Sequence, residues 1–340
     1  MRVLVTGASG FIGGTLVRLL RDEGHIGDQA IDVLAAADQR LPLSDAPGLL
    51  ALEGDLAGAA MLRRIADFAP QVCFHLAAVP GGAAEADPLL SRRVNLDGTL
   101  DLFQTLADAA RTRREAPPVV VYASTIAVYG SPLPDPVTPD SPTRPALIYG
   151  AHKLACEMML ADFTRRGLLD GRSLRLPGIV ARPRAPSGLL SAFMSELLHA
   201  LAAGEPFTCP VGPQATAWWM SAARCAQNLV HAASMDPARD AASQATRAWP
   251  LPVLRLSIAE VVRTLSRVHG VDGDRLVRYA PQPGIEAVFG RYPLLDDRAA
   301  RALGLRDDGT PEALVRRALD PLWCDASGAD DFSSPLKARP

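Results

Sequence analysis

Residues 1–13 read MRVLVTGASGFIG, a short apolar run followed by glycines spaced G-x-x-G-x-x-G. Such a turn between a strand and a helix binds a dinucleotide. Gly7 permits the tight turn, Gly10 lets the backbone approach a pyrophosphate, and Gly13 lets the helix pack against the strand. The N-terminus of the helix then offers free N–H groups to the anion. The position of the glycines between a strand and a helix, more than the glycines alone, predicts a cofactor site.

Asp38 stands at the end of the second predicted strand, where the choice between NAD and NADP is made. A carboxylate in this place accepts hydrogen bonds from the adenosine ribose and repels a 2′-phosphate, so NAD is predicted. Arg40 follows two residues later and leaves NADP open, because a guanidinium can pair with that phosphate.

The first half of the chain alternates apolar runs with helical patterns that begin near Ile12, Ala59, Ala84 and Tyr149. The predicted strands are residues 2–6, 32–37, 49–53, 71–77, 119–124 and 173–177. They do not alternate polar with apolar residues, which indicates burial on both faces in a parallel sheet. The prediction is an α/β fold with a doubly wound parallel (Rossmann) sheet.

Proline and glycine become frequent after residue 181, which predicts the crossing into a smaller C-terminal α/β substrate lobe. Its expected helices lie near residues 189–203, 222–234, 258–268 and 296–303. We therefore divide the chain into a cofactor domain (1–180), a segment that forms predominantly the substrate lobe (181–324) and a peripheral tail (325–340).

Composition excludes several classes of function. A net charge of -2 gives no electrostatic argument for nucleic acid or an anionic membrane surface, and no apolar run approaches the ~20 residues of a membrane helix. The five cysteines are scattered and predict neither disulfides nor a metal knuckle. No two histidines have metal-ligand spacing on one helix face, so no metal is expected. We expect a cytoplasmic protein without a signal peptide.

Tyr149 and Lys153 stand four residues apart on a predicted helix and share one face. A free phenol titrates near ~10 and needs a nearby cation to act as a base at neutral pH. Lys153 can supply that charge and lower the pKa of the phenol. Ser124 and Thr125 end the preceding apolar strand, where a hydroxyl can hold a substrate oxygen beside the phenol.

Five short motifs occur in a fixed order: the glycine turn, LAA at 76–78, NLDGT at 95–99, ST and VYG at 124–130, and YGAHK at 149–153. Together they resemble the extended short-chain dehydrogenase/reductase family, also called the NAD-dependent epimerase/dehydratase family, over about 180 residues. The resemblance implies Thr125, Tyr149 and Lys153 as the catalytic residues. It implies these residues around NAD: Gly7, Gly10, Phe11, Ile12, Gly13, Asp38, Asp55, Leu56, Leu76, Ala77, Ala78, Asn95, Ser124, Tyr149, Lys153, Pro177 and Ile179.

The same resemblance implies a homodimer, formed by two helices of each subunit. The helical stretches 95–110 and 151–164 carry the apolar residues expected at such an interface: Leu96, Leu100, Phe103, Leu154 and Met158. Each of them could equally face the sheet.

Many members of this family act on nucleotide-diphosphate sugars, but this chain departs from their pattern in two places. Gly178 stands where those members commonly carry an asparagine, and residues 216–221 lack the arginine and aspartate that clamp a diphosphate. Residues 149–186 and 218–232 instead resemble the D-erythronate dehydrogenase branch. That branch implies oxidation of the C2 hydroxyl of a small sugar acid with NAD.

Arg182 and Arg184 offer planar guanidinium groups suited to the carboxylate of such a substrate, although either could lie in a solvated loop. Thr125, Tyr149 and Trp218 are expected beside them, with the lobe core as the alternative place for Trp218 or its neighbour Trp219. A nucleotide-sugar epimerase or dehydratase and a non-catalytic NAD-sensing regulator remain alternatives. The intact catalytic set disfavours the regulator.

Overall fold

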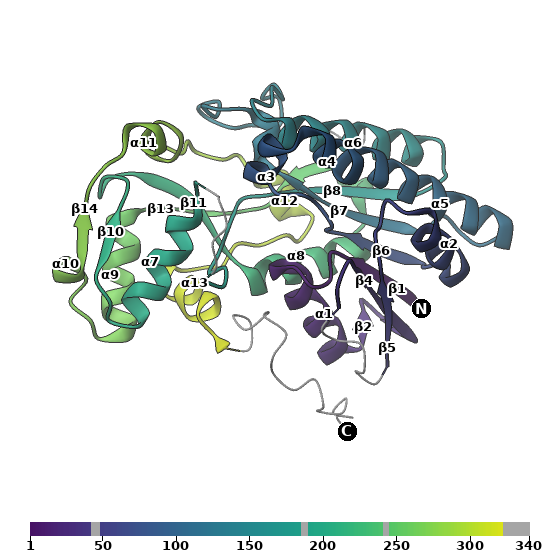
Figure 1. Ribbon diagram of the computed structural model, residues 1–340, viewed down its shortest axis with the longest axis horizontal. Coiled ribbons are helices and arrows are strands. Elements are labelled where there is room, and N and C mark those ends of the chain that lie inside the picture. Colours follow the sequence, from purple (N-terminus) through teal and green to yellow (C-terminus); the bar gives the residue numbers. More distant parts are fainter. Residues whose placement is uncertain (42–47, 185–189, 241–244, 322–340) are drawn as a thin grey trace.

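The computed structural model describes residues 1–41, 48–184, 190–240 and 245–321 (Figure 1). Its main sheet has seven strands in the order β12-β8-β7-β6-β1-β4-β5, and all of its strand pairs are parallel. The strands are β1 (Arg2–Thr6), β4 (Val33–Asp38), β5 (Leu49–Glu53), β6 (Val72–His75), β7 (Val119–Thr125), β8 (Asp170–Leu176) and β12 (Ala248–Pro250). The predicted doubly wound α/β sheet is confirmed.

Helices cover both faces of this sheet (Figure 1). The helices α1 (Phe11–Glu23) and α8 (Ala222–Ser234) share one apolar core with Val3 and Val5 of β1. The helices α2 (Ala59–Phe68), α5 (Gly98–Arg113) and α6 (Ile148–Arg165) share the opposite core with Leu4. The alternation of neighbouring β1 side chains between the two cores is the geometry of a strand buried on both faces.

Short elements connect these layers. Gly24 ends α1 in the left-handed conformation, with φ 69°, as its position after the helix indicates. The connecting elements are the hairpin β2 (His25–Ile26) and β3 (Gln29–Ala30), the helices α3 (Gly81–Ala86) and α4 (Pro88–Ser91), a π-helical turn (Arg92–Asp97), and 3₁₀ turns at Ile126–Tyr129 and Pro237–Arg239.

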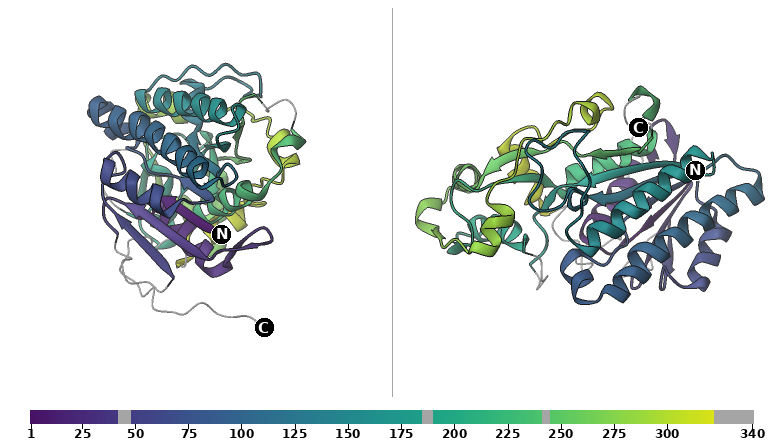
Figure 2. Two further views of the ribbon diagram at one scale, coloured as in Figure 1. Left: turned by 90° about the vertical axis from the view of Figure 1, so that its right-hand side faces the viewer. Right: turned by 90° about the horizontal axis from the view of Figure 1, so that it is seen from above.

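A second, smaller α/β unit with its own core extends beyond the sheet (Figure 2). Its strands are β9 (Gly178–Val180), β10 (Phe207–Cys209), β11 (Thr216–Ser221), β13 (Leu254–Ser257) and β14 (Val277–Tyr279). Its helices are α7 (Ala192–Ala202), α9 (Ile258–His269), α10 (Gly273–Leu276), α11 (Pro283–Phe289) and α13 (Pro311–Ala318). Ser257 and Glu260 form a capping box that starts α9. No helix in the described ranges is long and apolar enough to cross a membrane.

Part of the chain after residue 180 returns to the cofactor domain. The strand β12 adds to the edge of the main sheet beside β8. The helix α8 and residues of and next to α12 (Arg298–Ala302) pack into the same core as α1. The described residues between 181 and 321 therefore contribute to both units, and the tail 325–340 lies outside the described residues.

Candidate active site

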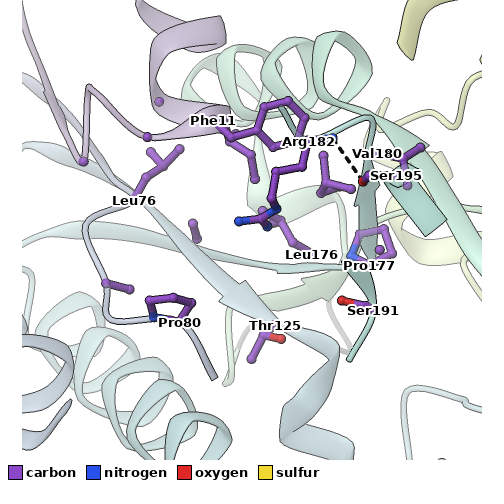
Figure 3. A pocket seen from close by; sticks show the side chains of 18 of the residues that line it. Phe11, Leu76, Pro80, Thr125, Leu176, Pro177, Val180, Arg182, Ser191 and Ser195 are labelled. Carbon is purple, nitrogen blue, oxygen red and sulfur yellow. Dashed lines mark hydrogen bonds between the residues drawn. The ribbon is translucent and has the colours of Figure 1, made fainter. Parts of the chain in front are cut away.

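A pocket opens at the carboxyl ends of the central strands, where the sheet order reverses between β1 and β6 (Figure 3). This is the place where ligands bind in open α/β sheets. The lobe closes its other side through β9 and α7. The lining residues are Gly7, Gly10, Phe11, Ile12, Gly13, Leu76, Ala78, Pro80, Ala123, Ser124, Thr125, Tyr149, Lys153, Leu176, Pro177, Gly178, Ile179, Val180, Arg182, Ser191, Ala192, Met194 and Ser195.

The glycine turn is a cradle of bare backbone. Gly7 has φ +71°, and a Cβ atom placed there would lie 2.6 Å from the amide nitrogen of Ala77. A Cβ atom on Gly13 would lie 1.9 Å from the carbonyl oxygen of Gly7. Gly10 caps α1 without a side-chain hydrogen bond to the first turn. The first-turn N–H groups therefore face the pocket edge, an arrangement that fits a pyrophosphate.

Asp38 lies beside this turn, at the end of β4. Its carboxylate accepts hydrogen bonds from the backbone N–H of Ser9 at 2.9 Å and of Gln39 at 2.7 Å. Asp55 accepts from the N–H of Ala57 and from Arg93. Neither aspartate is among the residues that line the pocket, and neither is Leu56, which packs against the core below α2. Their contacts with an adenosine therefore stay a prediction.

Asn95 holds the loop that follows β6 and does not line the pocket. It is buried, and its side-chain amide accepts from the N–H of Val79 at 2.7 Å and donates to the carbonyl of Val79 at 2.9 Å. The expected contact of Asn95 with the cofactor stays a prediction, and within the protein its side chain positions this loop. Of the loop it holds, Ala78 lines the pocket, and Ala77 lies against Gly7.

Tyr149, Lys153 and Thr125 meet at the floor of the pocket. The Lys153 ammonium donates to the carbonyl of Ala123 at 2.8 Å and lies 5.8 Å from the centre of the Tyr149 ring. Burial lowers the pKa of Lys153 to about 8. The Thr125 hydroxyl accepts the N–H of Ala127 at 3.1 Å, which leaves its own proton free for a substrate oxygen.

The pKa of Tyr149 differs from the sequence-based expectation. Burial raises it to about 12, and the positive charge that opposes the rise belongs to Arg182 rather than to Lys153. The desolvation of the phenol exceeds the effect of the Arg182 cation. The protein alone thus keeps this phenol protonated, and a further positive charge is needed before it can accept a proton.

Arg182 reaches into the pocket from the segment after β9 (Figure 3). Its backbone N–H donates to Ser195 Oγ at 3.0 Å, and His199 Nε2 lies 2.8 Å from its carbonyl oxygen, so α7 holds this segment in place. Its guanidinium carbon lies 5.7 Å from the centre of the Phe11 ring. The side chain is therefore a cation between the glycine turn and Tyr149.

Two residues expected beside the substrate lie away from the pocket in this structure. Arg184 lies outside the pocket and pairs with Glu205 at 2.7 Å, both side chains being half exposed. Trp218 is fully buried, donates its indole N–H to the carbonyl of Pro293, and packs edge-on against Tyr292. Core side chains surround the Trp218 ring, so neither face of the ring can contact a substrate.

Sequence reasoning missed the pocket residues that α7 contributes. Ser191, Met194 and Ser195 line the substrate side, opposite the end of β7. No motif marks them, because their place depends on how the lobe folds back over the sheet. The described residues contain no cluster of three or more histidine, cysteine, aspartate or glutamate side chains that could hold a metal ion.

Comparison with known proteins agrees with this geometry. Residues 3–234 match the NAD dependent epimerase/dehydratase family. The chain belongs to this family. It is accordingly an enzyme of the extended short-chain dehydrogenase/reductase class.

Two curated relatives match over nearly their full length. D-erythronate dehydrogenase of Cupriavidus necator is 33% identical over 94% of this chain and 98% of its own. The Haemophilus influenzae enzyme of the same name is 26% identical over 94% and 99%. Among solved structures, a nucleoside-diphosphate-sugar epimerase from Agrobacterium tumefaciens superposes with a TM-score of 0.85 at 30% identity, covering 93% of this chain and 92% of that one.

The glycine turn gives a direct prediction. Gly13→Ala should destabilise the fold by about 1–3 kcal/mol, the usual effect of overpacking, and should abolish NAD binding, because the methyl group meets backbone that cannot move away. Denaturant unfolding and fluorescence titration with NAD measure the two effects. Gly284→Ala, where the Cβ atom meets open space in α11, is the matched control. Unchanged NAD affinity in Gly13→Ala would contradict the assignment of the turn.

Proposed function

We propose that the protein is an NAD-dependent dehydrogenase that oxidises the C2 hydroxyl of a small sugar acid, resembling D-erythronate, to the 2-oxo acid. The observation that carries the proposal is Arg182, a cation inside the pocket whose charge acts on Tyr149. Two relatives that match this chain over 94% of its length are named D-erythronate dehydrogenase, which supports the substrate class.

The residues of the pocket have distinct roles in this reaction. Arg182 binds the substrate carboxylate, for which its planar guanidinium is suited. The carbon next to a carboxylate is C2, so this contact brings the C2 hydroxyl toward Tyr149. Thr125 donates a hydrogen bond to the hydroxyl oxygen, and Tyr149 accepts the proton that leaves it. Lys153, 5.8 Å from the centre of the Tyr149 ring, adds a weaker positive charge beside the phenolate.

The glycine turn, with Lys153, Pro177 and Ile179, would hold NAD along the pocket. When bound, NAD supplies a positively charged nicotinamide that accepts a hydride from the substrate carbon. That charge is the further cation that Tyr149 needs, because burial alone keeps its pKa near 12.

A nucleotide-diphosphate sugar fits the substrate side of the pocket less well. Arg182 is the one arginine among the pocket-lining residues, and Lys153 is held by the carbonyl of Ala123. A diphosphate carries two charged groups and is usually held by several charged donors. One half-buried guanidinium in the pocket matches a single carboxylate.

We expect Tyr149→Phe to bind NAD normally and to lose turnover by roughly 10²- to 10⁴-fold, the usual contribution of general acid–base catalysis. Thr125→Val, which keeps the shape of the side chain, should lower turnover by a smaller factor. The assay follows formation of reduced nicotinamide with D-erythronate. Tyr279→Phe, on β14 of the lobe, is the control. Wild-type turnover in Tyr149→Phe would disprove the catalytic assignment.

Arg182→Met should raise the KM for the sugar acid roughly 10- to 100-fold, since a hydrogen bond between charged groups is worth about 1.5–3 kcal/mol. Arg182 also lowers the pKa of Tyr149, so the pH at which the rate rises should move upward in this variant. The matched control is Arg184→Met, which removes an arginine two residues away that pairs with Glu205 outside the pocket. Equal effects of the two substitutions would argue against the carboxylate contact.

We propose NAD rather than NADP as the cofactor because Asp38 ends β4 beside the glycine turn. Asp38→Ala should narrow the difference in affinity between the two, since it removes both a ribose acceptor and the charge that repels a 2′-phosphate. Fluorescence titration of each cofactor gives the two dissociation constants. Tighter binding of NADP by the wild-type protein would refute this choice.

We further propose that the protein forms a homodimer. Of the five apolar residues expected at the interface, Phe103 is fully buried, and Leu96, Leu100 and Leu154 pack against the cores of their own subunit. Met158, 67% exposed on α6, is the one that is free to contact a partner. Further exposed apolar residues lie on α6 and on α4, which contacts it: Met159, Leu89 and Leu90.

Light scattering at micromolar concentration should give the mass of a dimer for the wild-type chain and of a monomer for Met158→Glu. A charge placed inside an apolar contact costs several kcal/mol when it has no partner. Leu294→Glu, at a site that is similarly exposed but away from these helices, should remain dimeric. A monomeric wild-type protein would exclude the interface.

A further inference from the structure

A buried carboxylate lies behind the catalytic residues and takes no part in the mechanism described above. Glu157 is 3% exposed and stands one helical turn after Lys153 on α6. It accepts a hydrogen bond from Ser124 Oγ on β7. It also accepts from Arg175 on β8, at 3.1 Å from Nε and 2.7 Å from Nη2. One side chain thus connects a helix to two neighbouring strands.

Arg175 extends this connection to the turn that follows the catalytic strand. Its Nη1 donates to the Tyr129 hydroxyl at 2.9 Å, and its guanidinium carbon lies 4.9 Å from the centre of that ring. Thr125 lies between Ser124 and the 3₁₀ turn that ends at Tyr129. The segment that carries the Thr125 hydroxyl is therefore linked to Glu157 at both ends: directly through Ser124, and through Arg175 at Tyr129.

Glu157 also contributes to the charge balance around Lys153. The groups that face the ammonium are Tyr149 and Cys156 on α6, Tyr122 on β7, whose ring centre is 4.7 Å away, and His75 on β6. Burial lowers the pKa of Lys153, and Cys156 together with the negative charge of Glu157 opposes that change.

A buried ion pair is a weak source of stability, because the cost of removing two charges from water offsets most of their attraction. Stability alone therefore does not account for Glu157 and Arg175 beneath the site. The position of Glu157 and Arg175 relative to Thr125 and Lys153 does account for their presence there.

We propose that Glu157 is a positioning residue for the reaction: it fixes the strand end that presents Thr125, and its charge retains Lys153 as an ammonium. The kinetic part of this inference rests on the proposed dehydrogenase activity. The structural part does not, and it has a readout of its own.

The composition of the chain makes a direct test possible, because Lys153 and Lys337 are its only two lysines. In protein labelled with ¹³C at lysine Cε, NMR shows two signals, and Lys337→Arg assigns them. A titration without substrate or cofactor then gives the pKa of Lys153, expected at about 8 in the wild-type chain.

Two variants should shift this pKa in opposite directions. Glu157→Gln removes the negative charge and should lower the pKa of Lys153 below its wild-type value, while Arg175→Gln removes the competing positive charge and should raise it. General loosening of the site would admit water and raise the pKa in both. Opposite shifts support the proposal, and shifts in one direction or no shift in Glu157→Gln overturn it. If Glu157→Gln does not fold, an unchanged or lowered pKa in Arg175→Gln overturns it as well.

Kinetics with a sugar acid add a second readout. Glu157→Gln should lower kcat at least tenfold and move the alkaline limit of the pH–rate profile downward, because Lys153 then loses its proton at lower pH. Glu157→Asp, which keeps the charge, should restore the wild-type profile. Asp170→Asn breaks an ion pair with Arg172 at the other end of β8 and is the matched control.

A wild-type pH–rate profile and kcat in Glu157→Gln would overturn the kinetic part. If no sugar acid is oxidised at all, the proposed function fails while the lysine titration still decides the role of Glu157.

Discussion

The turn after β1 approaches the next loop so closely that no side chain fits between them. A Cβ atom on Gly13 would lie 1.9 Å from the Gly7 carbonyl, and one on Gly7 would lie 2.6 Å from the amide of Ala77. This contact sets the distance between the start of α1 and the ends of β1 and β6. Because the pocket lies at those ends, its floor, its cofactor cradle and its access to Tyr149 all depend on the same constraint.

The second determinant is burial of charge. Enclosure in the sheet and the lobe raises the pKa of Tyr149 and lowers that of Lys153, so each group is displaced away from its ionised form. Arg182 opposes the change at Tyr149, and Glu157 opposes it at Lys153. A site built in this way has little ability to deprotonate a hydroxyl until further charges, from a cofactor and a substrate, are bound inside it.

The sequence predicted the parts of the site that are local in the chain. The glycine turn and the pair Tyr149/Lys153 depend on residues a few positions apart, and the structure brings them together. Arg182 and Arg184 look alike in sequence, but the end of β9 directs one into the pocket and the other toward Glu205. The strand β12 was not predicted, because three residues are too few to show a periodicity. Its position depends on pairing with the edge of β8 and on the core around Trp249, which are contacts distant in sequence.

The proposed reaction breaks the C–H bond at C2 of a small sugar acid and leaves the bond at C3 intact. The most direct measurement compares the rate of NAD reduction with D-erythronate carrying deuterium at C2 and with the same acid deuterated at C3, under conditions where the chemical step limits the rate. We expect a slower reaction with the C2 label and no change with the C3 label, because only the C2–H bond breaks. A slower reaction with the C3 label alone, or no reduction of NAD with either acid, would contradict it.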